Sequence, residues 1–371
     1  MPNHSFHQKE FAESTKTKLA LFRGYLEAWL PVFLNSPDRY SIVQVYDFFA
    51  GPGTDTEGND GSPLIAIKEI EAALETNKDR LSPKLRIRLV LNDSDKKKAC
   101  RLRDNIGKRH FRYADVSVEV HDEPFAELFA LEKPKMRTKG TANLIFIDQF
   151  GISEVSREIF GDIAATPSTD VLFFTSSAIV NRMKYHPSVQ SNIPSLSAAE
   201  LAKMNGKNVH RILSRSYRHW LPPKSDYYLG DFSLKNRSNV YGLVFGSRHI
   251  LGILKFLGVA WDLSGTGDAN YDIDDDHIDN NSPFLFEDFN KPNKVTEFES
   301  RVIEGVQQRQ FRTNFDILRF TVANGMLPKH AKEAFQKAIQ AGELPKQSLG
   351  SFATCWKQGS KTEIEYCGGT P

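Results

Sequence analysis

Apolar residues recur along the chain with two different periods, and these periods predict helices and strands in alternation. Residues 17–33 place Leu19, Tyr25 and Trp29 among apolar positions at helical spacing, which predicts an amphipathic helix. Short runs rich in Val, Ile, Leu and Phe follow, each bounded by polar or turn residues. They predict five strands, at residues 42–47, 85–91, 116–121, 142–147 and 170–175.

Helical patterns separate these strands. One covers residues 63–74 with Ser62 as its N-cap, a basic one begins near Ser94, and one covers residues 154–164. Strands that alternate with helices predict an open, mostly parallel α/β sheet, here a Rossmann-like one. In such a sheet the ligand lies at the carboxyl ends of the strands, near the point where the strand order reverses.

The C-terminal part follows a different pattern. Residues 296–308, 314–323 and 329–341 are expected to be helical, with a turn at Gly325 and Pro328 at a first helical position. The runs 350–357 and 361–366 resemble strands, and helices followed by a hairpin are typical of a winged helix. We therefore expect a helical segment over 1–40, a Rossmann-like domain over 41–290 and a winged-helix domain over 291–371. The second of these carries a basic helical insertion at about 195–240.

Composition narrows the class of protein only a little. The 371 residues carry a net charge of +2, which points to no particular partner. No apolar run approaches the ~20 residues that span a bilayer, and the polar N-terminus lacks the apolar core of a signal peptide. Three scattered cysteines supply neither a disulfide framework nor a zinc site. These features predict a cytoplasmic protein without a metal site.

Glycines follow the first predicted strand, in the run from Asp47 through Phe49 to Gly51 and Gly53. Glycine lets the backbone turn sharply and approach a ligand without a Cβ clash. Dinucleotide enzymes carry a third glycine at the start of a helix that faces a pyrophosphate, and this chain lacks it. The loop therefore favours a ligand without phosphate, for which S-adenosylmethionine is the candidate. Asp47 would then meet the amino group of the ligand.

Two further acids follow strands of the same sheet. Asp93 comes just after the second strand, where a carboxylate can accept both ribose hydroxyls. Asp122 comes just after the third strand, near the expected adenine edge. Any single acid in such a place is more often a helix cap. Three acids after three successive strands favour the ligand interpretation.

Asp148 and Phe150 follow the fourth strand, where methyltransferases hold the reacting group. Amino-methylating enzymes often carry Asp-Pro-Pro-Tyr there, and Gln149 stands in place of the first proline. Asp148 could hold the acceptor and Phe150 could stack against it, because methyl transfer needs mainly positioning. A loop cap and a core aromatic are the structural alternatives. Asp93, Asp122 and Asp148 could also supply a divalent-metal cluster, which would indicate a nuclease.

Several short segments belong to one pattern: 17–19, 25–26, 46–53, 61–64, 91–93, 146–151 and 243–249, with Trp261. Together they resemble the three-Cys-motif partner (TcmP) family, from about residue 15 to 275. The resemblance implies a class I methyltransferase sheet and a partner that bears a three-cysteine motif, similar to radical S-adenosylmethionine proteins. The family usually has proline where this chain has Gln149, a departure that bears on catalysis more than on cofactor binding.

Local charge suggests two nucleic-acid surfaces. Residues 203–249 hold nine Lys/Arg against two acids, and Arg211, Arg215 and Arg218 share a helical face beside Tyr217 and His219, whose rings could stack on bases. The alternative is an exposed helix whose charges pair with the acidic residues of 262–288. The predicted recognition helix offers Lys329 and Lys332 for phosphates, and Gln336 or His330 for bases, although winged helices also bind proteins.

The leading hypothesis is an S-adenosylmethionine-dependent methyltransferase-like protein that acts on or with DNA or RNA, together with a three-cysteine-motif partner, in a mobile-element or defence setting. One alternative is a scaffold that has lost transfer and recruits its partner to DNA. The other is the metal-dependent nuclease.

Overall fold

The computed structural model describes residues 11, 13–108, 116–149, 154–176, 182, 184–186, 202, 209–222, 225–236, 239–263 and 293–367. The chain divides into two compact units, Met1–Lys255 and Phe256–Pro371. The boundary therefore falls within a helix, about 35 residues before the domain limit expected from the sequence.

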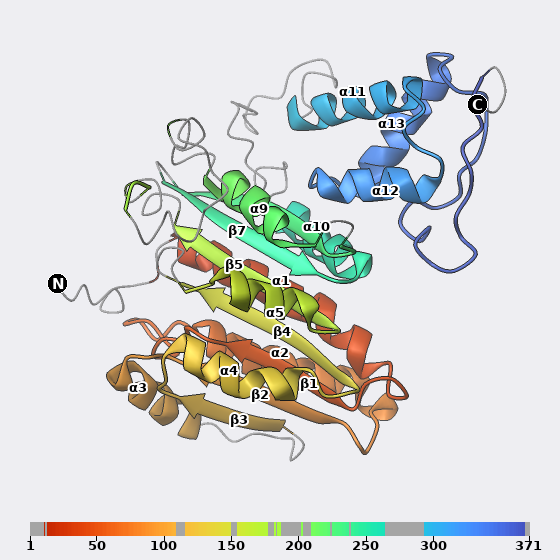
Figure 1. The fold of residues 1–371 in the computed structure, drawn as a ribbon. Coiled ribbons are helices and arrows are strands. Elements are labelled where there is room, and N and C mark those ends of the chain that lie inside the picture. The colour runs from red at the N-terminus through yellow and green to blue at the C-terminus, as the bar shows by residue number, and fades with distance from the viewer. Residues whose placement is uncertain are drawn as a thin grey trace. The chain divides into compact units, whose positions relative to one another are not determined.

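A seven-stranded sheet forms the centre of the first unit, in the order β3-β2-β1-β4-β5-β7-β6 (Figure 1). Its strands are β1 (Ile42–Asp47), β2 (Arg86–Asn92), β3 (Val116–His121), β4 (Thr141–Asp148), β5 (Thr169–Ser176), β6 (Tyr228–Asn236) and β7 (Asn239–Ser247). The first five are parallel, and all five were predicted from their apolar runs. Strand β7 runs antiparallel to both β5 and β6, so a hairpin completes one edge of the sheet.

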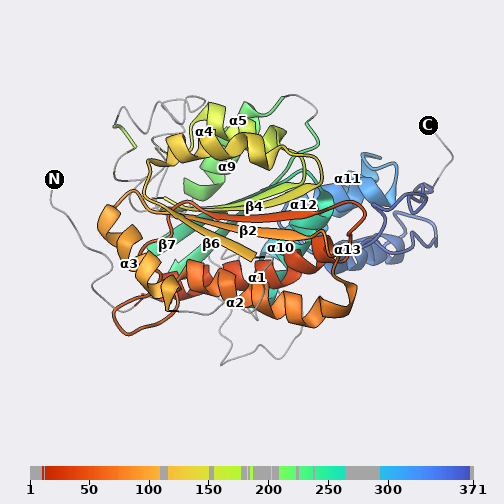
Figure 2. The ribbon, with the colours of Figure 1, turned by 90° about the horizontal axis from the view of Figure 1, so that it is seen from below.

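Helices cover both faces of this sheet, as Figure 2 shows. One face carries α1 (Glu13–Leu34), α2 (Ser62–Asn77) and α3 (Lys96–Gly107), and the other carries α4 (Phe125–Met136), α5 (Arg157–Ala165) and α9 (Val209–Trp220). Helix α10 (Ile250–Leu263) follows β7. Of the described helices, none combines the length and the apolar character needed to cross a membrane.

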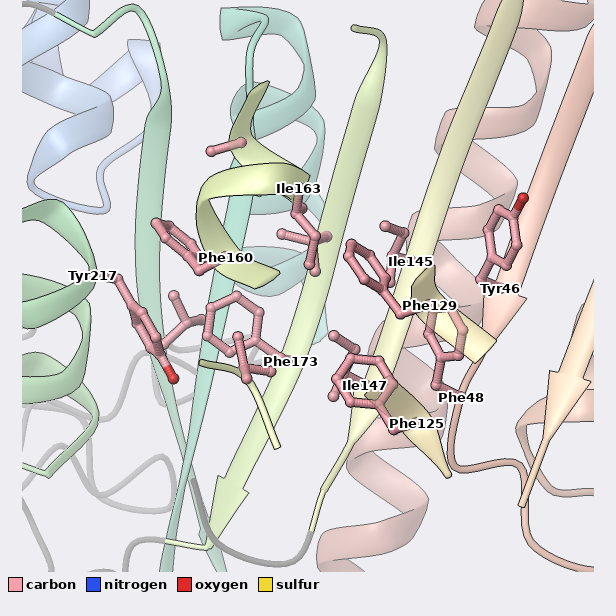
Figure 3. Packing of buried hydrophobic residues seen from close by; sticks show 14 of the residues in the cluster. Tyr46, Phe48, Phe125, Phe129, Ile145, Ile147, Phe160, Ile163, Phe173 and Tyr217 are labelled. Carbon is pink, nitrogen blue, oxygen red and sulfur yellow. The ribbon is translucent and has the colours of Figure 1, made fainter. Parts of the chain in front are cut away.

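A core of aromatic and aliphatic side chains fills the space between the sheet and the second group of helices (Figure 3). Phe48 packs against Phe125 of α4, and Phe160 of α5 packs against Tyr217 of α9 at a centroid distance of 4.9 Å. Tyr217 is 2% exposed. The prediction that its ring could stack on bases is therefore wrong, because the apolar ring belongs to the core.

Several local predictions differ from the structure. Ser62 is the first residue of α2, whose N-cap is Gly61, whereas α3 begins at Lys96 after its Asp95 cap, close to the predicted start. Helix α4 was not predicted, because the buried Glu132 interrupts its apolar face and Pro134 lies in its last turn. The expected basic insertion consists, in its described part, of α9 and the sheet strand β6.

The second unit contains α11 (Asn293–Gln307), α12 (Asn314–Ala323) and α13 (Pro328–Gln340), all three predicted. The two strand-like runs after α13 do not form the expected hairpin. Residues 350–360 make successive turns, and beyond them the described segment has one bridge, from Glu363 to Thr313. The buried Asn314 side chain bonds the backbone of Leu349, Ser360 and Thr362, which satisfies groups that a strand ladder would otherwise use.

Candidate ligand site at the carboxyl ends of the strands

The loop after β1 is held rigidly by backbone contacts. Gly51 and Gly53 have φ of 61° and 88°, a left-handed conformation that glycine adopts without strain. The Ala50 amide donates to the Asn92 carbonyl at 2.8 Å, and the Gly61 amide donates to the Gly53 carbonyl at 2.7 Å. These two bonds tie the loop to the end of β2 and to the start of α2.

Helix α3 packs closely against this loop. A Cβ built on Gly53 would lie 2.9 Å from Leu102 Cδ1, and the Asn105 side chain donates to the Pro52 carbonyl at 2.9 Å. Two reasons therefore demand glycine at position 53, a positive φ and the nearby leucine.

Asp47 ends β1 as a fully buried carboxylate. Its Oδ1 accepts the Phe49 amide at 3.2 Å, and its Oδ2 has no hydrogen-bond partner within the described part of the chain. Burial raises the pKa of Asp47 to about 7 against the opposing effects of the Ser62 hydroxyl and the Phe49 amide, and the carboxylates of Asp148 and Asp93 raise it further. A buried acid with an unpaired oxygen is suited to a cationic ligand group.

Asp93, two residues beyond the register partner of Asp47, supports the loop directly. Its Oδ2 accepts the Gly51 amide at 3.1 Å, and its Oδ1 accepts the Asp95 amide at 2.9 Å. Lys98 Nζ lies 3.8 Å from Oδ2. An ionised carboxylate has about four acceptor positions, so two remain for hydroxyl groups of a ligand.

Asp122 and Phe49 lie in less enclosed surroundings. Asp122 pairs with Arg103 of α3 at 3.0 Å, and its side chain is 31% exposed. The ring of Phe49 is half-buried and packs against Phe125 at a centroid distance of 5.5 Å. Both follow strands at the same edge as Asp47, so the structure brings the predicted cofactor residues to one end of the sheet (Figure 1).

Asp148 is the last residue of β4 and forms an ion pair with Lys18 of α1. Lys18 Nζ lies 2.7 Å from Oδ1 and 2.6 Å from Oδ2, and it also lies over the ring of Phe174 at 5.3 Å from the centroid. The predicted role of Asp148 did not include a pairing with Lys18. The second predicted acceptor residue, Phe150, lies outside the described residues.

Gln149, which stands where the related pattern has proline, is turned into the protein. It is 3% exposed, and its Oε1 accepts the Glu154 amide at 3.1 Å. Its Nε2 has no hydrogen-bond partner within the described part of the chain. The side chain thus lies inside the protein and accepts a backbone hydrogen bond three residues before α5.

A second buried acid fixes the helix that carries Lys18. The Tyr25 hydroxyl donates to Asp170 Oδ2 at 2.7 Å, near the start of β5. Burial raises the pKa of Asp170 to about 6, although the hydroxyls of Ser247 and Tyr25 oppose the shift. Tyr25 lies seven residues after Lys18, which is two helical turns, so both side chains lie on the face of α1 that meets the sheet. This spacing is the sequence signal that could have identified Lys18.

The predicted nucleic-acid residues divide into several groups. Arg218 donates to the Leu229 carbonyl of β6 at 3.2 Å, and the side chains of Arg211 and Arg215 lie outside the described residues. In α13, Lys329, Lys332 and Gln336 are exposed. His330 is 6% exposed and bonds the Leu327 amide at 3.1 Å, so the prediction that it reaches a base is wrong.

The three acids of the nuclease alternative do not form a metal site. Asp93, Asp122 and Asp148 each have a cationic partner, and no group of three metal-ligating side chains occurs among the described residues.

Comparisons with known proteins give only weak structural alignments. No family model matches the sequence, and no curated protein is recognised as a relative. A S-adenosylmethionine-dependent methyltransferase from Agrobacterium tumefaciens aligns with 10% identity over 64% of this chain and 62% of that protein, with a TM-score of 0.34. The chain thus spans less than two thirds of that protein's length.

Two more solved structures give similar values. A protein from Legionella pneumophila aligns with 14% identity over 61% of this chain and 84% of its own, with a TM-score of 0.30. An N-methyltransferase from Bradyrhizobium japonicum aligns with 10% identity over 61% of this chain and 95% of its own, with a TM-score of 0.25. Scores of this size do not establish a common fold, so the fold assignment rests on the strand order itself.

Proposed function

We propose that this chain binds S-adenosylmethionine at the carboxyl ends of β1 and β2 and belongs to the methyltransferase-like proteins. The strand order 3-2-1-4-5 of its parallel part reverses between β1 and β4, where α/β sheets bind their ligands. The antiparallel β7 between β5 and β6 is the arrangement expected of a class I methyltransferase sheet. The observation that carries the proposal is the unpaired Oδ2 of the buried Asp47 at this reversal point.

The residues present suit that cofactor. Asp47 would bind the ammonium group of the cofactor, which would be the cationic partner of the buried carboxylate. Asp93 would accept the ribose hydroxyls at its remaining positions, while its bonds to Gly51 keep the loop in place. Asp122 and Phe49 would lie toward the adenine. When bound, S-adenosylmethionine supplies an electrophilic methyl group.

At the end of β4, Lys18 and Asp148 would face the acceptor. Asp148 could accept a proton from the attacking group, and the Lys18 ammonium could hold an oxygen or a phosphate of the acceptor in position. Because the Asp148 side chain is 33% exposed, the pair is accessible to a ligand.

The same pair supports a second candidate function. Lys18 contacts both oxygens of Asp148, and the loop after β4 carries Gln149 where the related pattern has proline. A scaffold that binds the cofactor without transferring its methyl group would have these features. It would act as a DNA-binding or partner-recruiting module.

The acceptor and the partner are proposed from the sequence. Nucleic acid fits the lysines exposed on α13, and a three-cysteine-motif protein follows from the TcmP resemblance. The order α11, α12, α13 is compatible with a helix-turn-helix unit, in which the segment after α13 forms turns in place of a hairpin wing.

Calorimetric titration with S-adenosylmethionine tests the proposal, with NAD and ATP as controls. We expect binding of the first compound alone, and at least a ten-fold weaker affinity for Asp47→Asn. The matched control is Asp79→Asn, because that acid is exposed and lies before β2, at the opposite end of the strands from the candidate site. Absence of binding would refute the proposal. Binding without transfer of labelled methyl to DNA or RNA, alone or with the partner, would favour the second candidate.

A further inference from the structure

Helix α3, which packs against the glycine loop of the candidate site, carries a dense cluster of basic residues. Residues 95–108 hold six Lys/Arg against Asp95 and Asp104, a net charge of +4. The buried face of the helix consists of Ala99, Leu102 and Ile106 and packs against the glycine loop. The opposite face has no role in the site described above.

The exposed face presents its cations in a row. Lys97, Arg101 and Lys108 are exposed and lie within one stripe, since they are separated by four and seven residues. At 1.5 Å per residue the row is about 16 Å long. Asp104 lies in the same stripe between Arg101 and Lys108.

Folding does not account for these cations. Two other basic residues of the helix are used locally, Lys98 beside Asp93 and Arg103 with Asp122. By contrast, Lys96, Lys97, Arg101 and Lys108 make no ion pair with any residue that the structure describes. Lysines in the first turn of a helix also oppose its dipole, so Lys96 and Lys97 do not stabilise the isolated helix.

We propose that this face of α3 binds the phosphate backbone of duplex DNA beside the candidate site. Adjacent lysine and arginine side chains neutralise successive phosphates without reading the base sequence. The exposed positions of α3 carry no aromatic ring, whereas single-strand binding relies on aromatic stacking platforms. A convex helix fits the ~12 Å major groove of B-form DNA better than the deep, narrow major groove of duplex RNA.

This inference rests on nucleic acid as the acceptor class of the proposed function, and it adds the surface that holds it. Because the buried face of α3 contacts Pro52 and Gly53, DNA bound to the opposite face lies one helix diameter from the cofactor loop. Docking there would bring a nucleotide near the carboxyl ends of the strands.

Fluorescence anisotropy of a labelled DNA duplex with the full chain tests the proposal between about 50 and 200 mM salt. Lys97→Glu with Arg101→Glu should weaken binding about ten-fold or more and reduce the salt slope by about 2, because each phosphate contact contributes about 0.9. Asp104→Lys should have the opposite effect and strengthen binding. The matched control, Lys84→Glu with Lys139→Glu, makes the same charge change at exposed positions before β2 and β4, at the opposite end of the strands, and should change affinity less than the α3 variant.

Each other outcome overturns the inference. If the duplex binds but the α3 variants leave its affinity unchanged, α3 is not the surface, while nucleic acid remains the acceptor class. If single-stranded nucleic acid or duplex RNA binds more tightly than duplex DNA, the assignment of the ligand is wrong. If no nucleic acid binds, both fail. S-adenosylmethionine titration of the same α3 variants separates these results from the cofactor proposal, since their affinity for it should be unchanged.

Discussion

Asp47→Asn gives the sharpest prediction, because the buried carboxylate destabilises the ligand-free protein. The pKa of Asp47 is raised to about 7, roughly three units above the value of an unfolded chain, and each unit corresponds to about 1.36 kcal/mol. The raised value means that the folded state favours the protonated acid. Protonation of Asp47 therefore stabilises the folded state fully below pH ~4. This stabilisation is lost as the pH rises to about 7, and the free energy of unfolding falls by up to about 4 kcal/mol.

Asparagine removes the charge and keeps the shape, but its amide also lacks a partner, which costs about 1–3 kcal/mol. We therefore expect ligand-free Asp47→Asn to be about 1–3 kcal/mol more stable than wild type at pH 8, and nearly equal to it at pH 5. Urea unfolding of both proteins at the two pH values measures the difference, in which other titrating groups cancel. Asp79→Asn is the control, because it makes the same substitution at an exposed carboxylate outside the candidate site.

The affinity of the wild-type protein for S-adenosylmethionine should rise with pH, whereas its stability falls. If the ionised Asp47 receives the ammonium group of S-adenosylmethionine, the wild-type affinity falls up to about ten-fold per pH unit below pH ~7. Asp47→Asn should bind weakly at every pH. A variant that is no more stable at pH 8, or that keeps the pH-dependent affinity, would refute the reasoning about this acid.

Three further predictions follow from the same contacts. Gly53→Ala should unfold at lower urea than Gly58→Ala, because both positions have positive φ, 88° and 82°, but only the first Cβ would meet a side chain of α3; equal losses would contradict the packing argument. Tyr25→Phe should cost about 1–3 kcal/mol, more at pH 8 than at pH 5, because the hydroxyl stabilises ionised Asp170, whose pKa is about 6; a loss that does not depend on pH would count against this bond. Lys18→Met should leave the S-adenosylmethionine dissociation constant within about three-fold and lower the rate of labelled-methyl transfer; unchanged transfer would remove the lysine from the acceptor site.

The local pattern of the sequence predicted a large part of the fold. The bounds of β1 and β3 follow from apolar runs, and α12 follows from its helical period. The glycine loop and the acids at the strand ends are also local features, because parallel strands bring their carboxyl ends to one edge of the sheet. For these elements, the residues two to four positions apart carry the information.

Long-range contacts decided the rest. The antiparallel β7, the buried Tyr217 and the turns of residues 350–360 depend on partners that are distant in the sequence. The site shows this most clearly, because Asp47 and Asp148 both end parallel strands. One lacks a partner at Oδ2, and the other is held by Lys18, which lies 130 residues away in the sequence. The sequence by itself determined which acids reach this edge, and only the tertiary structure decided which of them keeps an unpaired oxygen, because burial and ion pairing are set by side chains that folding brings together.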